Sequence, residues 1–124
     1  MSTNLALTQA AYEGFGNGDM NPLFSILAED ILWNSHSHPS SPFHGVHRGV
    51  PAIQAYFGNM VKVELEKFEI MNMIEADDRV VVLVDVRRVT KESGQMIEGM
   101  AVHTYKFANG KITQADLYEP SAAL

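Results

Sequence analysis

Apolar residues recur at two different periods along the chain, and the period changes near residue 64. Before that point, Leu7, Ala11 and Phe15 recur every fourth residue, which is the spacing of one helical face. Ser2 or Thr3 is suited to cap this helix, and the sequence Gly-Asn-Gly-Asp at 16–19 is typical of its end. The pattern therefore predicts a first helix that ends near residue 16.

A second, short helix is predicted to start at Pro22, because proline is preset for the first helical position. Its buried side is expected to carry Leu23, Phe24, Ile26 and Leu27, and Glu29-Asp30 marks its exit. A strand over 31–35 follows, and then a loop rich in Ser, Pro, His and Gly. A third helix is predicted from Pro51, with one apolar side formed by Ile53, Tyr56, Phe57 and Met60.

From about residue 64 the pattern alternates as in strands, and turn residues divide it into four segments, 65–74, 79–90, 95–107 and 111–119. The sequence Asn109-Gly110 favours a tight hairpin whose residues have positive φ. Three helices and a mainly antiparallel sheet predict an α+β fold over a single domain, residues 1–124. We expect the curved sheet to enclose a largely apolar pocket for a small organic molecule.

Charge and composition exclude several classes of partner. The 124 residues hold 9 Lys and Arg against 15 Asp and Glu, a net charge of −6, and no basic stripe is present. Nucleic acid and anionic membranes are therefore not expected as partners. The absence of cysteine excludes disulfides, thiolate nucleophiles and Cys-ligated zinc. The longest apolar run, 80–84, is too short to span a bilayer, and we predict a cytoplasmic protein.

Alternation along 95–107 predicts which side chains form a pocket wall. One face carries Ile97, Gly99, Ala101, His103, Tyr105 and Phe107. Its small residues leave room for a ligand. His103 is the only titratable group on this face with a pKa expected near neutrality, so it is the first candidate for an acid or base.

Four motifs together resemble a known family. They are Tyr12-x-x-Phe15-x-x-Gly18-Asp19, Leu27-Ala28-Glu29-Asp30-x-x-Trp33, Phe43-His44-Gly45-x-x-Arg48-Gly49 and Asn109-Gly110-Lys111-Ile112. Their order over residues 4–119 resembles the SnoaL-like branch of the nuclear transport factor 2-like superfamily, which also includes ketosteroid isomerases. The resemblance implies a cone-shaped, cystatin-like α+β barrel, usually a homodimer. It also implies isomerase, cyclase, epoxide hydrolase or dehydratase activity, or none, because fold does not settle function.

The catalytic sets of two well-known branches are not matched. The resemblance places Ser35 where ketosteroid isomerases have their catalytic base, and His103 where they have the acid. Ala11 stands at the position of their helix tyrosine, and Tyr12 is turned about 100° around the helix from Ala11. At the positions of the limonene epoxide hydrolase set stand Ala101, His103 and Leu117. A SnoaL-type cyclase needs one acid or base, which His103, Asp85, Asp116 or Glu119 could supply.

The resemblance also suggests which faces of two other strands line the pocket. In 79–90 it turns Asp85 and Arg87 inward and leaves an all-valine face to be buried against helices or a partner subunit; the alternative is an exposed Asp85–Arg87 pair. In the last strand it favours Thr113, Ala115, Leu117 and Glu119 over the face with Asp116 and Tyr118. Asp116 remains a candidate if the register is opposite.

These observations give one set of candidate residues. The predicted catalytic residues are His103, Asp85 and Asp116. The predicted ligand-binding residues are Trp33, Ser35, Tyr56, Met60, Arg87, Ala101, Tyr105, Leu117 and Glu119. The hypothesis is a cofactor-independent enzyme that transfers protons on a small, apolar, oxygenated molecule. The alternative is a non-catalytic module for ligand binding or dimerisation.

A group of histidines, His36, His38, His44 and His47, suggests a metal site, since imidazole binds zinc, copper and nickel. The group lies on a Ser- and Pro-rich loop and lacks carboxylate or thiolate companions. We therefore predict no metal there and interpret the segment as a solvated or lid-like loop.

Overall fold

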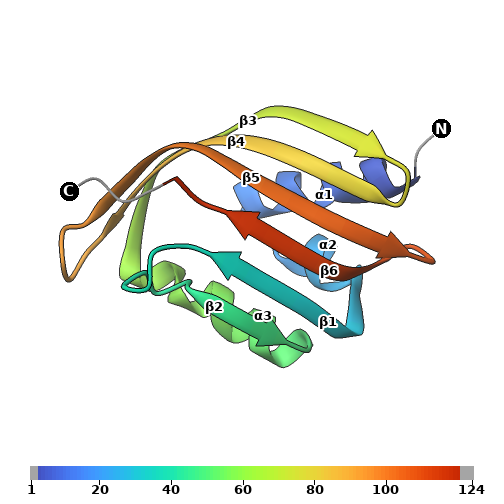
Figure 1. Cartoon of the computed structure of the whole chain (residues 1–124), viewed down its shortest axis with the longest axis horizontal. Helices are drawn as coiled ribbons and strands as arrows, with labels where there is room; N and C mark the ends of the chain where they lie inside the picture. Colours follow the sequence, from blue (N-terminus) through green and yellow to red (C-terminus); the bar gives the residue numbers. More distant parts are fainter. Residues whose placement is uncertain (1–2, 121–124) are drawn as a thin grey trace.

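The computed structural model describes residues 3–120 as a curved sheet with helices on one side (Figure 1). The helices are α1 (Thr3–Gly16), α2 (Asn21–Phe24), α3 (Val50–Gly58) and the short 3-10 helix η1 (Asn59–Lys62). The strands are β1 (Leu27–His36), β2 (Gly45–Arg48), β3 (Val63–Ala76), β4 (Arg79–Thr90), β5 (Met96–Ala108) and β6 (Lys111–Tyr118). Within residues 3–120, no helix is long and apolar enough to cross a membrane.

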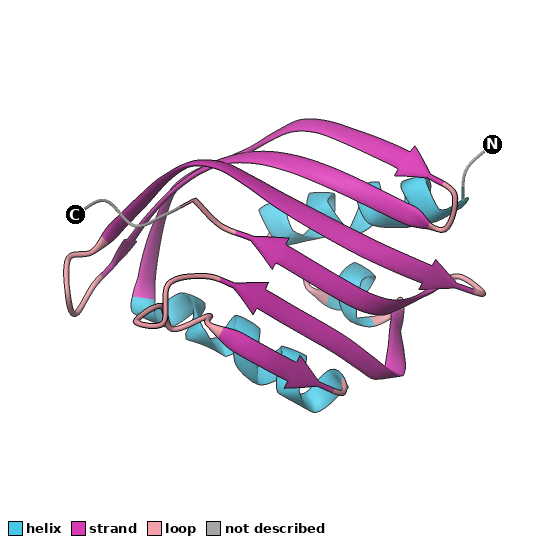
Figure 2. Ribbon diagram, viewed as in Figure 1, coloured by secondary structure: helices cyan, strands magenta, loops and turns pink. Residues whose placement is uncertain are grey.

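The six strands form one mixed sheet in the order β2-β1-β6-β5-β4-β3. Among the strand pairings formed by residues 3–120, β1–β6 is parallel and the others are antiparallel. Helix α1 packs against β3 and β4, and α3 packs against β1 and β2, so the helices cover the same face of the sheet (Figure 2). The predicted α+β class, with N-terminal helices on a mainly antiparallel sheet, is confirmed.

Two local signals for the ends of elements were accurate, whereas Glu29-Asp30, expected to mark the end of the second helix, lies within β1. Helix α1 ends at Gly16 as predicted, while Ser2, one of its two candidate caps, lies outside the described residues. At the β5–β6 hairpin, Asn109 and Gly110 have φ values of 52° and 75°. Asparagine and glycine are the residues that most readily adopt these values, which explains why this turn was the clearest in the sequence.

Two elements differ from the prediction. Helix α2 ends at Phe24, because the next apolar residues pair with the sheet. The Ile26 carbonyl accepts a hydrogen bond from the Ile112 backbone N–H at 2.7 Å, and Leu27 pairs with Ile112 in the sheet. The segment read as a loop contains strand β2, which pairs with β1. Four residues are too few to display a period, so this strand could not be predicted from alternation.

The expected orientation of β4 is wrong. Val80, Val82 and Val84 are fully buried on the inner face, under the helices. Asp85 and Arg87 therefore point to the outer face, where they pair with Lys67 at 2.7 Å and Glu66 at 2.9 Å. The pairing of β4 with β5 has no register shift, so the alternation of faces along β4 is unbroken. Burying four valines and leaving two charges hydrated is more stable than the reverse orientation.

The expected faces of β5 and β6 are mostly correct. Ala101, Tyr105 and Phe107 are buried on the inner face of β5, and Ala115 and Leu117 are buried on β6. A register shift between Lys106 and Phe107 lies opposite the start of β6. It turns Ile112 inward in place of Thr113, whose hydroxyl bonds to the Lys106 carbonyl instead.

Candidate functional site

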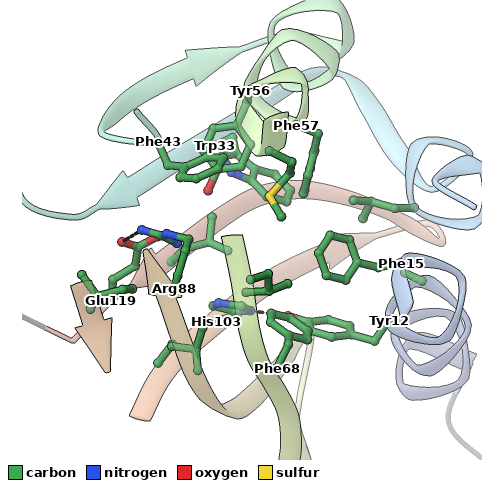
Figure 3. A pocket seen from close by; sticks show the side chains of 18 of the residues that line it. Tyr12, Phe15, Trp33, Phe43, Tyr56, Phe57, Phe68, Arg88, His103 and Glu119 are labelled. Atoms are coloured by element: carbon green, nitrogen blue, oxygen red, sulfur yellow. Dashed lines mark hydrogen bonds and ion pairs between the residues drawn. The ribbon is translucent and has the colours of Figure 1, made fainter. Parts of the chain in front are cut away.

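A pocket of about 90 Å³ lies between the inner face of the sheet and the helices (Figure 3). Its walls are mainly aromatic and aliphatic side chains, and few polar groups reach it. The lining residues are Ala11, Tyr12, Phe15, Leu23, Trp33, Phe43, Tyr56, Phe57, Met60, Leu65, Phe68, Val86, Arg88, Ile97, Ala101, His103, Tyr105, Leu117 and Glu119. An apolar cavity with a few converging polar groups is the usual form of a small-molecule site.

Three side chains form a hydrogen-bonded chain on one wall of the pocket. The Tyr12 hydroxyl, from α1, lies 2.5 Å from His103 Nδ1 and 2.7 Å from the Tyr105 hydroxyl. His103 and Tyr105 are two residues apart on β5, so they share its inner face and Tyr12 joins them from above the sheet. We call these three residues the Tyr–His–Tyr chain.

The Tyr–His–Tyr chain has two possible hydrogen-bond directions, because the roles of the imidazole nitrogens depend on the tautomer. In one direction His103 Nδ1–H donates to Tyr12 and Tyr12 donates to Tyr105, which leaves His103 Nε2 as an acceptor and the Tyr105 hydroxyl as a donor. In the other direction, every donor and acceptor is exchanged. The two ends of the chain therefore always have opposite character, one able to accept a proton and one able to donate one.

Burial keeps this chain uncharged at neutral pH. Burial, assisted by the positive charge of Arg88, lowers the pKa of His103 to about 4. Burial also raises the pKa of Tyr12 well above its ordinary value, and the neighbouring Tyr105 adds to this shift. The pKa of Tyr105 is raised by burial as well. Near pH 7 the imidazole is therefore neutral and both phenols are protonated.

A buried ion pair forms another side of the pocket. Arg88 Nη1 and Nη2 donate to the two carboxylate oxygens of Glu119 at 2.9 Å and 2.8 Å. Their side chains are only 10% and 8% exposed, and the Arg88 guanidinium lies 4.7 Å from the centre of the Phe43 ring. Because both carboxylate oxygens and both terminal nitrogens are engaged, this pair is fixed in position.

Most of the residues predicted from the sequence meet at this pocket. It is lined by Trp33, Tyr56, Met60, Ala101, His103, Tyr105, Leu117 and Glu119. Ser35 is buried beside the pocket and is not part of its lining. Asp85, Arg87 and Asp116 do not reach it, because all three lie on the outer face of the sheet.

Asp116 has an ordinary structural environment on that outer face. Its Oδ1 accepts hydrogen bonds from Asn34 Nδ2 and His36 Nε2, both at 3.0 Å, and its Oδ2 accepts one from Gln114 at 3.1 Å. Partial burial alone raises the pKa of Asp116, but these hydrogen bonds outweigh it and lower that pKa overall. The alternative register that would have turned Asp116 into the pocket is therefore wrong.

Sequence reasoning missed two polar members of the site, Tyr12 and Arg88. Tyr12 was set aside because Ala11 occupies the expected helical position, yet both residues line the pocket and the long tyrosine side chain reaches His103. Arg88 follows the four valines at the same alternating spacing. A lone charge on an otherwise buried face needs a partner, and that signal could have identified Arg88 as the partner of Glu119.

The four histidines of the predicted loop lie apart in the structure: His36 ends β1, His47 lies in β2 with its ring against Tyr56, and His38 and His44 lie on the segment between the two strands. His36 bonds to Asp116, His38 to Ser40, and His44 to the Ser37 carbonyl. Across residues 3–120, no group of three or more His, Cys, Asp or Glu side chains is arranged to hold a metal ion.

Comparison with known proteins places this architecture in a family. The family model described as a SnoaL-like domain matches residues 8–115. No curated protein matches the chain. Many solved structures do, and three of them illustrate the likeness.

An NTF2-like protein of unknown function from Burkholderia pseudomallei is 25% identical with a TM-score of 0.79, over 96% of this chain and 92% of that one. TerC, co-crystallised with polyporic acid, is 23% identical with a TM-score of 0.78, over 95% and 92%. A protein of unknown function with a cystatin-like fold from Xanthomonas campestris is 19% identical with a TM-score of 0.77, over 96% and 91%. With its NTF2-like fold and a family match over most of its length, the chain belongs to the SnoaL-like domain family.

Proposed function

We propose that the protein is a cofactor-independent enzyme that binds a small, mostly apolar, oxygenated molecule and moves protons on it. The observation that carries this proposal is the Tyr–His–Tyr chain, which places a proton acceptor and a proton donor together on the wall of an apolar pocket. An isomerase, cyclase, dehydratase or hydrolase could each use such a pair. General acid and base catalysis of this kind contributes about 10²–10⁴-fold to a rate.

The chemistry is simplest for an enolisable carbonyl compound. A proton leaves a carbon of the ligand for His103 Nε2, and the Nδ1 proton passes to Tyr12. The Tyr12 proton passes to Tyr105, and the Tyr105 proton passes to the carbonyl oxygen. The electron pair of the broken C–H bond becomes the new C=C bond, and the carbonyl π pair forms the new O–H bond. No group ends with a charge, which suits a site where burial disfavours imidazolium and phenolate.

A non-catalytic binding module is the second candidate. It is favoured by Ser35, which occupies the position where ketosteroid isomerases have their catalytic base, and by the low basicity of His103. TerC, which shares the fold, was co-crystallised with polyporic acid, and a small organic ligand suits either candidate.

A ligand panel with product analysis distinguishes the two candidates. Ketones, lactones, epoxides and hydroxy acids are screened by thermal shift, where a ligand at 100 times its Kd adds about 2.7 kcal/mol and raises the midpoint by several degrees. Each hit is then incubated in D2O and followed by NMR. Conversion, or deuterium uptake next to a carbonyl, supports the enzyme. Binding with neither change supports the binding module.

The pH dependence of turnover provides a separate test. With a substrate from the panel, kcat/KM is expected to stay level through neutral pH and to fall only as the pH drops through about 4, where His103 becomes protonated. A fall near pH 6.5 would contradict the neutral chain. The unfolded chain binds a proton at His103 below about pH 6.5 and the folded chain does not, so folding stability declines from there toward pH 4. Circular dichroism at each pH separates unfolding from titration.

We also propose that two copies of the chain associate through the outer face of the sheet. The valine face cannot serve, because it lies under the helices. On the outer face, Leu83, Val102 and Tyr118 pair directly across β4, β5 and β6, and Met100 and Tyr118 are 49% and 46% exposed. Exposed apolar clusters of this kind often mark subunit contacts.

Analytical ultracentrifugation tests this association. The unaltered protein is expected to sediment as a dimer, and Met100→Glu as a monomer, because a charge would be buried at the contact. Val61→Glu is the matched control, since Val61 is 75% exposed on η1, which is not part of the sheet. A wild-type monomer, or a Met100→Glu dimer, would refute the proposed interface. Location in the cytoplasm stays a prediction from the sequence.

A further inference from the structure

Three polar atoms beside the pocket are buried without a hydrogen bond. They are Trp33 Nε1, Ser35 Oγ and His47 Nε2, which have no partner of normal geometry within residues 3–120. Trp33 and Ser35 lie two residues apart on the inner face of β1. His47, on the neighbouring strand β2, is the residue paired with Trp33. Buried polar groups are rarely left unpaired, because desolvation is then uncompensated, so a cluster of them requires an explanation.

Tyr56 joins this cluster from α3. Its ring packs edge-on against Trp33, with ring centres 5.7 Å apart, and against His47 at 5.1 Å. Burial raises the pKa of Tyr56. Ser35 and Trp33 lie close enough to the Tyr56 hydroxyl to offset part of this rise in pKa. An indole N–H and two hydroxyls therefore converge beside the cavity. One N–H that can only donate and two hydroxyls that can donate or accept are suited to hold a single oxygen atom.

The cluster and the Tyr–His–Tyr chain belong to one pocket. Trp33 and Tyr105 both line it, with ring centres 6.0 Å apart. In Figure 3, Trp33 and Tyr56 lie on one side of the cavity, and Tyr12 and His103 lie on the opposite side. A molecule that reaches both sides would pass between apolar walls and meet polar groups at its two ends.

The charge around Tyr56 selects a neutral oxygen. The Glu119 carboxylate raises the pKa of Tyr56 and the Arg88 guanidinium lowers it, so the two charges oppose each other there. Arg88 already gives both terminal nitrogens to Glu119. Among the described residues that line the pocket, a ligand carboxylate would therefore find no cation free to pair with it, whereas a carbonyl or hydroxyl oxygen needs none.

We infer that the ligand carries two oxygen functions at opposite ends, one at the Tyr–His–Tyr chain and a neutral carbonyl or hydroxyl oxygen held by Trp33 and Tyr56, which Ser35 supports from beside the pocket. This inference rests on the proposed function only in taking the pocket as the ligand site. It narrows the substrate class from apolar oxygenated molecules in general to those oxygenated at both ends.

Matched probes of two lengths test the inference by calorimetry. Cyclohexanone is compared with cyclohexane-1,4-dione, and 4-hydroxybiphenyl with 4,4′-dihydroxybiphenyl. In at least one pair, the compound with two oxygens is expected to bind about tenfold more tightly, since it satisfies groups that its partner leaves unpaired. Equal affinities within both pairs would overturn the inference.

Two serine variants show whether the preference arises at this cluster. Ser35→Ala is expected to reduce the affinity ratio of the favoured pair severalfold, because Ser35 acts on the Tyr56 hydroxyl. The thermal midpoint should change little, because the Ser35 hydroxyl has no hydrogen bond of normal geometry within residues 3–120. Ser37→Ala is the matched control, since its buried Oγ is also unpaired but, unlike that of Ser35, does not act on Tyr56. If the affinity ratio is unchanged in Ser35→Ala, the assignment is refuted. It is also refuted if Ser35→Ala lowers the thermal midpoint of the free protein, because the Ser35 hydroxyl would then serve stability, for example by holding a buried water, and not ligand binding.

The outcome is independent of catalysis. If the two-oxygen probes keep their preference but no compound is converted, the proposed enzyme fails and the two-ended site stands. If turnover occurs with no preference for a second oxygen, the enzyme stands and the two-ended site fails.

Discussion

Replacing His103 with alanine is expected to lower kcat by about 10²–10⁴-fold, the range that a positioned acid or base contributes. Ligand affinity is expected to change much less, because the apolar walls that bury the ligand remain. His103→Gln should lose a comparable factor in kcat, since an amide cannot accept a proton at one atom and release one at another. Steady-state kinetics, with direct binding measured in parallel, separates kcat from affinity.

His38→Ala is the matched control for His103, because His38 bonds to Ser40 on the exposed loop and does not line the pocket. Tyr12→Phe separates a relay from a lone base. It leaves His103 in place and breaks both links of the Tyr–His–Tyr chain, so kcat should fall although the base is present. Full turnover in Tyr12→Phe would show that protons do not pass through Tyr12, and full turnover in His103→Ala would remove the proposed mechanism entirely.

The sequence was informative where one physical rule acted alone. Alternation along β5 identified Ala101, His103 and Tyr105 as a wall because that strand keeps its register through the pocket. The Asn109-Gly110 turn was predictable because few residues adopt positive φ without strain. These signals are local, and the tertiary structure agrees with them.

The sequence was misleading where tertiary packing decided between two local solutions. On β4, either face could have turned inward. Turning Asp85 and Arg87 inward would bury two charges and expose four valines, which costs more free energy than the reverse, so the valines lie inside. The interaction of Tyr12 with His103 spans 91 positions in the chain, and it depends on how α1 lies across the sheet. No spacing rule within a single element contains that information.

Breaking the Arg88–Glu119 pair is expected to have the largest effect on stability of any change at the site. Glu119→Ala leaves the Arg88 charge buried without its partner, which costs about 3–5 kcal/mol of unfolding free energy, or roughly 10–20 °C in Tm for a domain of this size. Denaturant and thermal unfolding measure both quantities. Arg87→Met is the matched control: Arg87 is the adjacent residue and pairs with Glu66 at 2.9 Å, but its side chain is 46% exposed, so about 1 kcal/mol or less should be lost.

The double variant Arg88→Met, Glu119→Met distinguishes charge pairing from packing. If the cost in Glu119→Ala comes from an uncompensated charge, removing both charges together should restore most of the stability, because apolar residues of similar size often replace a buried ion pair without loss. The same variant should raise the pKa of His103, since Arg88 contributes to lowering it. The acid limb of kcat/KM would then move to higher pH. Poor recovery of stability in the double variant would show that the pair acts through its bidentate geometry and its contact with Phe43.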